Sequence, residues 1–133
     1  MKRNVTLTVT SLLSILLFTL HVSDDIVRGV DKISSANLIG VTIFVVWLYG
    51  ILPLGDRRSG YVIMLLGSLF AGLPALAHMI TGVSRTMAKS PGGALLFVWT
   101  LWALAITANF SVVLSVRGLW RREWAPGTKE SGM

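Results

Sequence analysis

Apolar residues run along most of this chain in four long stretches that contain no Lys, Arg, Asp or Glu. The stretches cover residues 5–22, 38–54, 61–82 and 91–116, and each has at least 17 residues. Because a helix rises about 1.5 Å per residue, roughly 20 residues cross a hydrocarbon core of about 30 Å, and about 17 is near the lower limit. Membrane strands would need only about 10 residues and would alternate in polarity, which these stretches do not. The pattern predicts an all-α polytopic membrane protein.

We expect one transmembrane domain over residues 1–125, followed by a disordered cytoplasmic tail at residues 126–133. The turn at residues 55–60 is short enough to force the second and third helices into an antiparallel hairpin. The two outer connections, centred on residues 30–36 and 84–90, are somewhat longer, and we expect an antiparallel four-helix transmembrane bundle. Its helices are expected at approximately residues 5–29, 37–54, 60–83 and 91–118.

The basic residues are distributed unequally between the two ends of such a bundle. Eight of the twelve fall on the side of the N-terminus, namely Lys2, Arg3, Arg57, Arg58, Arg117, Arg121, Arg122 and Lys129. Four fall on the other side, namely Arg28, Lys32, Arg85 and Lys89. The positive-inside rule then predicts a multi-pass protein of the cell inner (plasma) membrane with both termini cytoplasmic. The net charge of +6 is largely this topology signal, and we expect no nucleic-acid partner.

Composition narrows the chemistry that the chain can perform. Apolar residues make up 53% and charged residues 14%, against about 25% charged in soluble domains. The chain has no cysteine, which excludes thiolate catalysis and Cys-ligated metal sites. Neither GxSxG, HExxH nor a phosphate-binding glycine loop occurs, so we assign no catalytic residue and expect a protein that is not an enzyme.

A polar cluster follows the first apolar stretch, in the sequence LHVSDDIVRG. At about 100° per residue, His21, Asp24, Asp25 and Arg28 fall within one arc of roughly 100°. The first helix can therefore continue to Gly29, a natural C-terminal stop, with one polar face. His21 and Asp25 are spaced i,i+4, as are Asp24 and Arg28, so side chains on neighbouring turns can meet.

The second histidine, His78, is predicted to lie at the same depth as His21. Counted from the cytoplasmic starts of the first and third helices, both lie roughly 24–26 Å above the boundary. Both helices run in the same direction, and both histidines share a face with small residues that permit close packing. The predicted cluster at the outer interface therefore consists of His21, Asp24, Asp25, Arg28 and His78.

Several interpretations of this cluster stay open. It can be a solvated helix end beside the outer headgroups. His21, Asp24, Asp25 and His78 could instead ligate zinc, iron or manganese. A haem could lie between His21 and His78, since imidazoles from two helices of a bundle can serve as axial ligands. In a small proton-coupled transporter an aspartate would titrate, although no acidic residue lies inside a predicted span. The sequence itself requires no cofactor.

Small and hydroxyl residues at four-residue spacing predict how the helices pack. We expect Asn109 to bond between helices, because an unpaired amide in hydrocarbon costs several kcal/mol. The predicted packing residues are Thr6, Thr10, Ser14, Gly67, Ala71, Thr107, Ser111 and Asn109.

These patterns favour a small integral membrane protein that is a non-enzymatic accessory subunit or a self-associating bundle. Its partners would be the lipid bilayer and either itself or another membrane protein. The alternatives are a haem- or metal-binding redox protein that uses His21 and His78, and a small proton-coupled transporter.

The charge distribution makes the topology testable. Reporter fusions placed at Lys32 and Lys89 should report the outer side of the membrane, and a fusion after Lys129 should report the cytoplasm. The measurement is the activity of compartment-specific reporters. A C-terminal fusion that reports the outer side would contradict the predicted topology.

Overall fold

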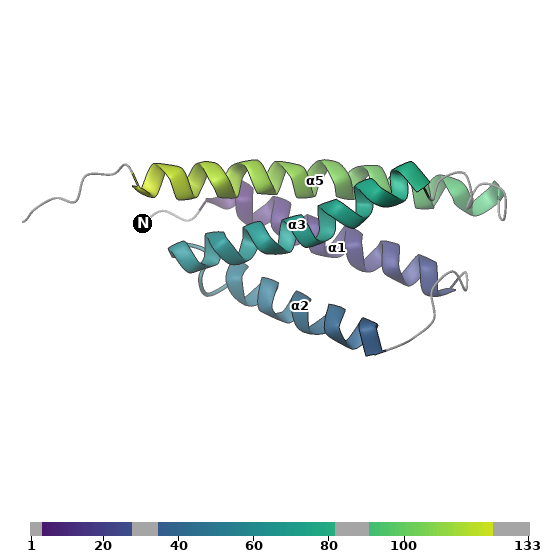
Figure 1. Ribbon diagram of the computed structural model, residues 1–133, viewed down its shortest axis with the longest axis horizontal. Helices are drawn as coiled ribbons and strands as arrows, with labels where there is room; N and C mark the ends of the chain where they lie inside the picture. Colours follow the sequence, from purple (N-terminus) through teal and green to yellow (C-terminus); the bar gives the residue numbers. More distant parts are fainter. Residues whose placement is uncertain (1–3, 28–34, 82–90, 124–133) are drawn as a thin grey trace, which may run out of the picture.

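The structure, a computed structural model, describes residues 4–27, 35–81 and 91–123. Its helices pack as a bundle, which confirms the predicted all-α class (Figure 1). The predicted helix ends at residues 29 and 83 and the tail at residues 126–133 lie outside the described residues. The helices are, in chain order, α1 (Val5–Val27), α2 (Ser35–Ile51), α3 (Arg58–Thr81) and α5 (Pro91–Glu123).

Local sequence explains where two of the helices begin. Asn4 caps α1, since the Leu7 N–H donates to Asn4 Oδ1 at 3.1 Å. Asparagine is among the preferred N-cap residues because its side chain satisfies a backbone donor that has no partner within the helix. α5 begins at Pro91, as expected for a residue whose missing N–H costs nothing in a first turn.

The second helix is shorter than the apolar pattern predicts. α2 ends at Ile51, whereas the pattern extended it to residue 54. Pro53 disfavours helical geometry at the residue before it, so the helix stops there. The chain then turns tightly, with the Arg57 N–H donating to the Leu54 carbonyl at 2.8 Å. α5, in contrast, runs to Glu123, beyond the predicted end at residue 118.

Two glycines show where α2 and α3 approach each other, as the expected antiparallel hairpin. A Cβ added at Gly67 would overlap the ring of Trp47, and one added at Gly50 would overlap Ile63. The two pairs lie in opposite chain order on the two helices, which defines the antiparallel register.

Glycines also allow α3 and α5 to approach each other closely, and these two helices form the most extensive contact of the bundle. A Cβ at Gly118 would overlap the Tyr61 ring, and one at Gly72 would lie 3.4 Å from the Ala108 Cβ. α1 packs against the same helix, and the Ser111 hydroxyl of α5 donates to Thr10 Oγ1 of α1 at 2.9 Å. These contacts define which residues of α1 and of α3 lie at the same level as a given residue of α5.

Within the described residues α2 is the peripheral helix. It packs mainly on α3 and slightly on α1, and has no contact with α5. Figure 1 accordingly places α2 and α5 along opposite edges of the bundle. An aromatic cluster holds α2 to its neighbours: the Phe18 ring lies 5.3 Å from Phe44 and 5.8 Å from Phe70.

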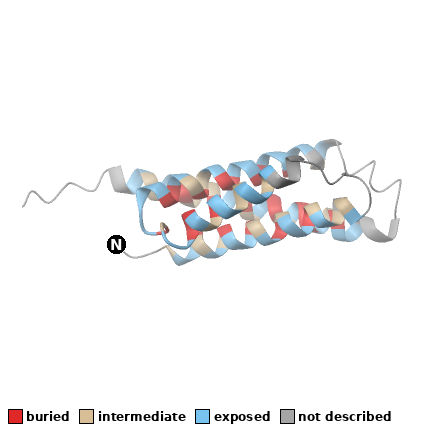
Figure 2. Cartoon of the chain, turned by 90° about the horizontal axis from the view of Figure 1, so that it is seen from below, coloured by how far each residue is buried: buried red, intermediate tan, exposed pale blue. Residues whose placement is uncertain are grey.

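Burial in this bundle does not follow polarity. Serines on three helices are fully buried, whereas large apolar side chains such as Ile80 (84% exposed) and Leu95 (81% exposed) cover the outside. Figure 2 shows the buried residues along the inward faces and the exposed residues along the outward faces of the helices. An apolar exterior of this kind belongs in hydrocarbon, where apolar surface is not expelled.

Three of the described helices are long and apolar enough to cross a membrane, as a multi-pass membrane protein requires. The spans are Val5–Asp24, Arg58–Ala77 and Leu95–Arg121. The apolar part of α2, Ile39–Ile51, is shorter. Which end of the bundle faces the cytoplasm stays a prediction.

The packing of Trp47 on Gly67 predicts a difference between two glycine substitutions in α3. Gly67→Ala should lower the free energy of unfolding by about 1–3 kcal/mol, because the new methyl group must displace a buried indole. Gly72→Ala is the matched control and should be neutral or slightly stabilising, since its Cβ meets Ala108 at ordinary contact distance. Circular dichroism during denaturation in detergent micelles measures both, and equal effects would contradict the packing.

Candidate functional site

His21 lies inside the bundle, on the last turns of α1. Its side chain is 4% exposed, and its ring centroid is 4.9 Å from that of Phe97 on α5, with the two planes tilted by 42°. Sequence spacing alone placed His21 on a polar arc. In the structure the ring has an apolar aromatic neighbour, because α5 covers this side of α1.

The structure describes the other members of the predicted cluster only in part. Asp24 is half-buried, one turn beyond His21 on the same helix. Asp25 and His78 are helical in their backbones, but their side chains lie outside the described residues, as does the whole of Arg28. The cluster as a set therefore stays a prediction.

The helix register bears on the depth of the two histidines. Continued along the chain, the pairing of α1 and α3 with α5 brings the backbones of both His21 and His78 level with residues 100–102 of α5. Equal depth along the bundle is what counting residues from the two helix starts predicted. Depth alone does not bring two side chains together, since α1 and α3 pack only lightly on each other.

The described residues supply part of the ligands that a metal or haem would need. Among the side chains described, no three metal-ligating groups gather around one point. A zinc, iron or manganese site would therefore have to draw on Asp25 or His78, which lie outside that set. A haem would need open space beside an imidazole, whereas His21 is enclosed by its neighbours. Both hypotheses remain untested predictions.

Hydroxyl side chains gather in the middle of the bundle, where α1, α3 and α5 meet. By the register above, all lie within about one turn of Ser111, and we call them the hydroxyl belt. Ser111 bonds to Thr10, and the Ser14 hydroxyl donates to the Thr10 carbonyl at 2.9 Å. The belt consists of Thr10, Ser11, Ser14, Ser68, Ser111 and Ser115, all fully buried except Thr10.

Three belt hydroxyls, those of Ser11, Ser68 and Ser115, have no hydrogen-bond partner among the described residues. A buried hydroxyl without a partner costs about 1–3 kcal/mol. On a helix, however, rotation about χ1 brings a serine hydroxyl to the carbonyl four residues earlier, the bond that Ser14 makes. The belt is therefore best understood as a packing surface with small polar side chains.

The other predicted packing residues fall into two groups. Gly67 and Ala71 are buried, and Thr107 is half-buried. Thr6 and Asn109 are exposed, and the amide of Asn109 donates within its own helix to the Ala105 carbonyl at 2.7 Å. The carbonyl four residues earlier is within reach of an asparagine, so Asn109 satisfies its amide without bonding to another helix.

Several buried residues were absent from the predicted set. Ser115 continues the four-residue spacing of Thr107 and Ser111, so that signal could have found it. Ser68 lies four residues before Gly72, so the same spacing could have found it, whereas Ser11 lies outside the series of Thr6, Thr10 and Ser14. Trp47 was also absent from that set, although its indole is 1% exposed and is the largest buried side chain of α2.

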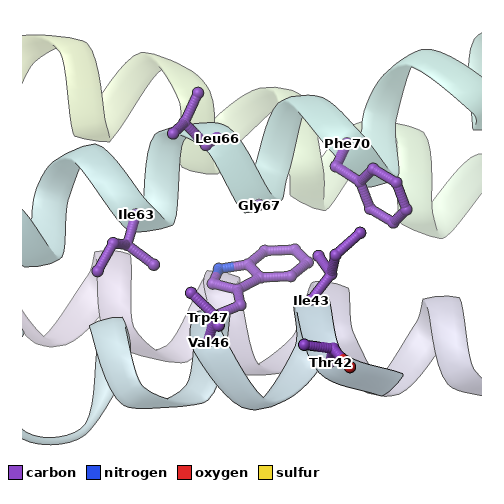
Figure 3. A pocket seen from close by; sticks show the side chains of 8 residues that line it. All are labelled: Thr42, Ile43, Val46, Trp47, Ile63, Leu66, Gly67 and Phe70. Atoms are coloured by element: carbon purple, nitrogen blue, oxygen red, sulfur yellow. The ribbon is translucent and has the colours of Figure 1, made fainter. Parts of the chain in front are cut away.

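An apolar groove separates α2 from α3 on the surface of the bundle (Figure 3). It holds about 350 Å³, and the flat indole of Trp47 lies across its floor beneath Gly67. The groove is open on the outside because, within the described residues, α2 packs mainly on α3 and no further helix covers this side. Its lining residues are Thr42, Ile43, Val46, Trp47, Ile63, Leu66, Gly67 and Phe70.

Comparison of the chain with protein-family models, with curated proteins and with solved structures finds no match.

The bond between Ser111 and Thr10 joins α1 to α5 and can be tested by a double-mutant cycle. Ser111→Ala combined with Thr10→Val should give a coupling energy of about 0.6 kcal/mol, and at most about 1.7, as measured for hydrogen bonds between membrane helices. Thr19→Val is the control, since the Thr19 hydroxyl donates within its own helix to the Ile15 carbonyl at 2.8 Å. Paired with Ser111→Ala, it should show no coupling in detergent unfolding assays.

Proposed function

We propose that this chain is a non-enzymatic protein of the inner (plasma) membrane, with four spans and both termini in the cytoplasm. We infer that it works by associating with a second copy of itself through α2 and the groove beside it. The observation that carries the proposal is the open space around Gly40.

Gly40 differs from the other glycines of the described spans. Gly50, Gly67 and Gly118 each leave room for a side chain of a neighbouring helix, and Gly72 lies against Ala108. At Gly40 an added Cβ would meet nothing within 4 Å. Glycine costs about 1 kcal/mol relative to alanine inside a helix, and in membrane helices it commonly marks a close approach to a neighbour. A neighbour outside the monomer would account for Gly40.

The surroundings of Gly40 favour a helix as that neighbour. One turn further along α2 the apolar groove begins, at Thr42 and Ile43. A ridge at helical spacing borders the groove on α2, formed by the exposed residues Ile39, Thr42 and Val46. Packing of such a ridge into a groove is the usual geometry of helix contacts.

A second copy of this chain would supply both parts of such a contact. In a two-fold symmetric dimer each surface meets its own equivalent, so the ridge of one protomer can enter the groove of the other, and the reverse. The same rotation would bring Gly40 of one copy near α2 of its partner. The peripheral position of α2, away from α5, leaves this side accessible.

Energy transfer between labelled copies in liposomes tests this proposal. The chain lacks cysteine, so Lys129→Cys provides a single labelling position. Gly40→Leu should weaken association at least about tenfold, because it fills the space that a partner helix needs. Its fold should be unchanged, since a Cβ added at Gly40 meets no described atom within 4 Å.

Val41→Leu is the matched control, because Val41 is exposed on the next position of the same helix and points about 100° away. It should leave energy transfer unchanged. Wild-type protein that shows no transfer at any ratio of protein to lipid would overturn the proposal. Equal loss in Gly40→Leu and Val41→Leu would overturn the assignment of this face.

A further inference from the structure

A second groove runs along the outer face of α5 near its C-terminal end. It holds about 590 Å³, and the described residues that line it come from three successive turns of α5. Its lining residues are Val112, Val113, Val116, Arg117, Trp120 and Arg121.

The groove changes character along its length. Val112, Val113 and Val116 form an apolar half that belongs to the charge-free stretch of the helix. Arg117 is the first charged residue after that stretch, and Arg121 follows one turn later. Trp120, 64% exposed, lies between them, at the position where aromatic side chains mark the membrane–water interface. The apolar half therefore lies at the level of acyl chains and the basic half at the level of headgroups.

The two arginines are arranged to bind one anion. They are spaced i,i+4, so their Cβ atoms lie about 5–6 Å apart on one face of the helix. Neither forms an ion pair with a carboxylate whose side chain the structure describes. A guanidinium offers paired N–H donors that match two oxygens of a phosphate, and the indole N–H of Trp120 adds a second kind of donor at the same level.

The charge around the groove favours an anionic ligand. The contact between Tyr61 and Gly118 brings the start of α3 level with the end of α5, so Arg57 and Arg58 belong to the same end of the bundle. The acidic residues of the described segments at this end are Asp56 and Glu123. Basic residues thus outnumber acidic ones here.

We propose that this groove binds one phospholipid with an anionic headgroup, whose phosphate lies between Arg117 and Arg121. An acyl chain of the same lipid lies along the three valines. The valine half is the reason to infer a lipid and not free phosphate, since a soluble anion would gain nothing from an apolar wall that leads into the bilayer. This site is independent of the association through α2.

Native mass spectrometry of the full chain, released from detergent micelles, tests the proposal. Phosphatidylglycerol and phosphatidylcholine of the same acyl composition are the probes, added in equal amounts. Wild-type protein should retain one phosphatidylglycerol with a preference of roughly tenfold to thirtyfold, the ratio expected for two basic residues near an anionic lipid. Arg117→Gln combined with Arg121→Gln should reduce this preference to about twofold or less.

Arg57→Gln combined with Arg58→Gln is the matched control, because it removes the same charge from the same end but outside the groove. It should leave the preference within about twofold of wild type. Equal loss in both double variants would reduce the effect to net charge and overturn the site. Val116→Ser should weaken retention of phosphatidylglycerol. Displacement of the lipid by inorganic phosphate alone would show an anion site that does not use the apolar half, and would also overturn the proposal.

Discussion

Two aromatic rings placed against glycines determine how the helices of this bundle register. The Trp47 ring occupies the space beside Gly67, and the Tyr61 ring occupies the space beside Gly118. Neither ring could lie there if the glycine carried a side chain, so each contact fixes one helix against another without a polar interaction. These two contacts fix the levels of α2, α3 and α5, and the bond between Ser111 and Thr10 fixes the level of α1. Together they give the equal depth of the histidine backbones and the position of the hydroxyl belt.

The hydroxyl belt follows from the same close packing. In hydrocarbon, burial of a leucine gains little over its exposure to lipid, so helix contacts depend on fit and on hydrogen bonds. Serine is small enough for close approach and can satisfy its hydroxyl on its own helix. Fully buried serines accordingly line the interior of α1, α3 and α5, beside buried leucines such as Leu7, Leu101 and Leu104, and many other large apolar residues of these helices face outward. α2 lacks serines beyond its first residue and attaches instead through rings, which is why it remains peripheral with a groove beside it.

Sequence patterns predicted the existence of the helices well, because a long charge-free stretch identifies a helix without any knowledge of its neighbours. The same patterns predicted the ends of the helices and the contacts between them less well, since these depend on individual residues and on the helices packed alongside. Pro53 shortened α2 through local geometry that hydropathy ignores, and Asn109 found an acceptor four residues back where a bond between helices was expected. The inward position of Ser14 followed from its spacing, whereas that of Ser11 depends on how α1 packs in the bundle. The polar cluster around His21 is intermediate: its arc is a property of one helix, but its assembly requires a second.

The length of α5 constrains where the whole bundle lies in a bilayer. Its 33 residues extend roughly 50 Å, well beyond a hydrocarbon core of about 30 Å, so the helix must project from it. The two ends differ in chemistry: one begins with Pro91 and two glycines, and the other carries Arg117, Trp120 and Arg121. Cations and an interfacial aromatic hold a helix end at the headgroups, and within α5 cations occur only at the end that carries Arg117 and Arg121. Because α1 and α3 are in register with α5, an anchor at that one end sets the depth of the other two spans as well.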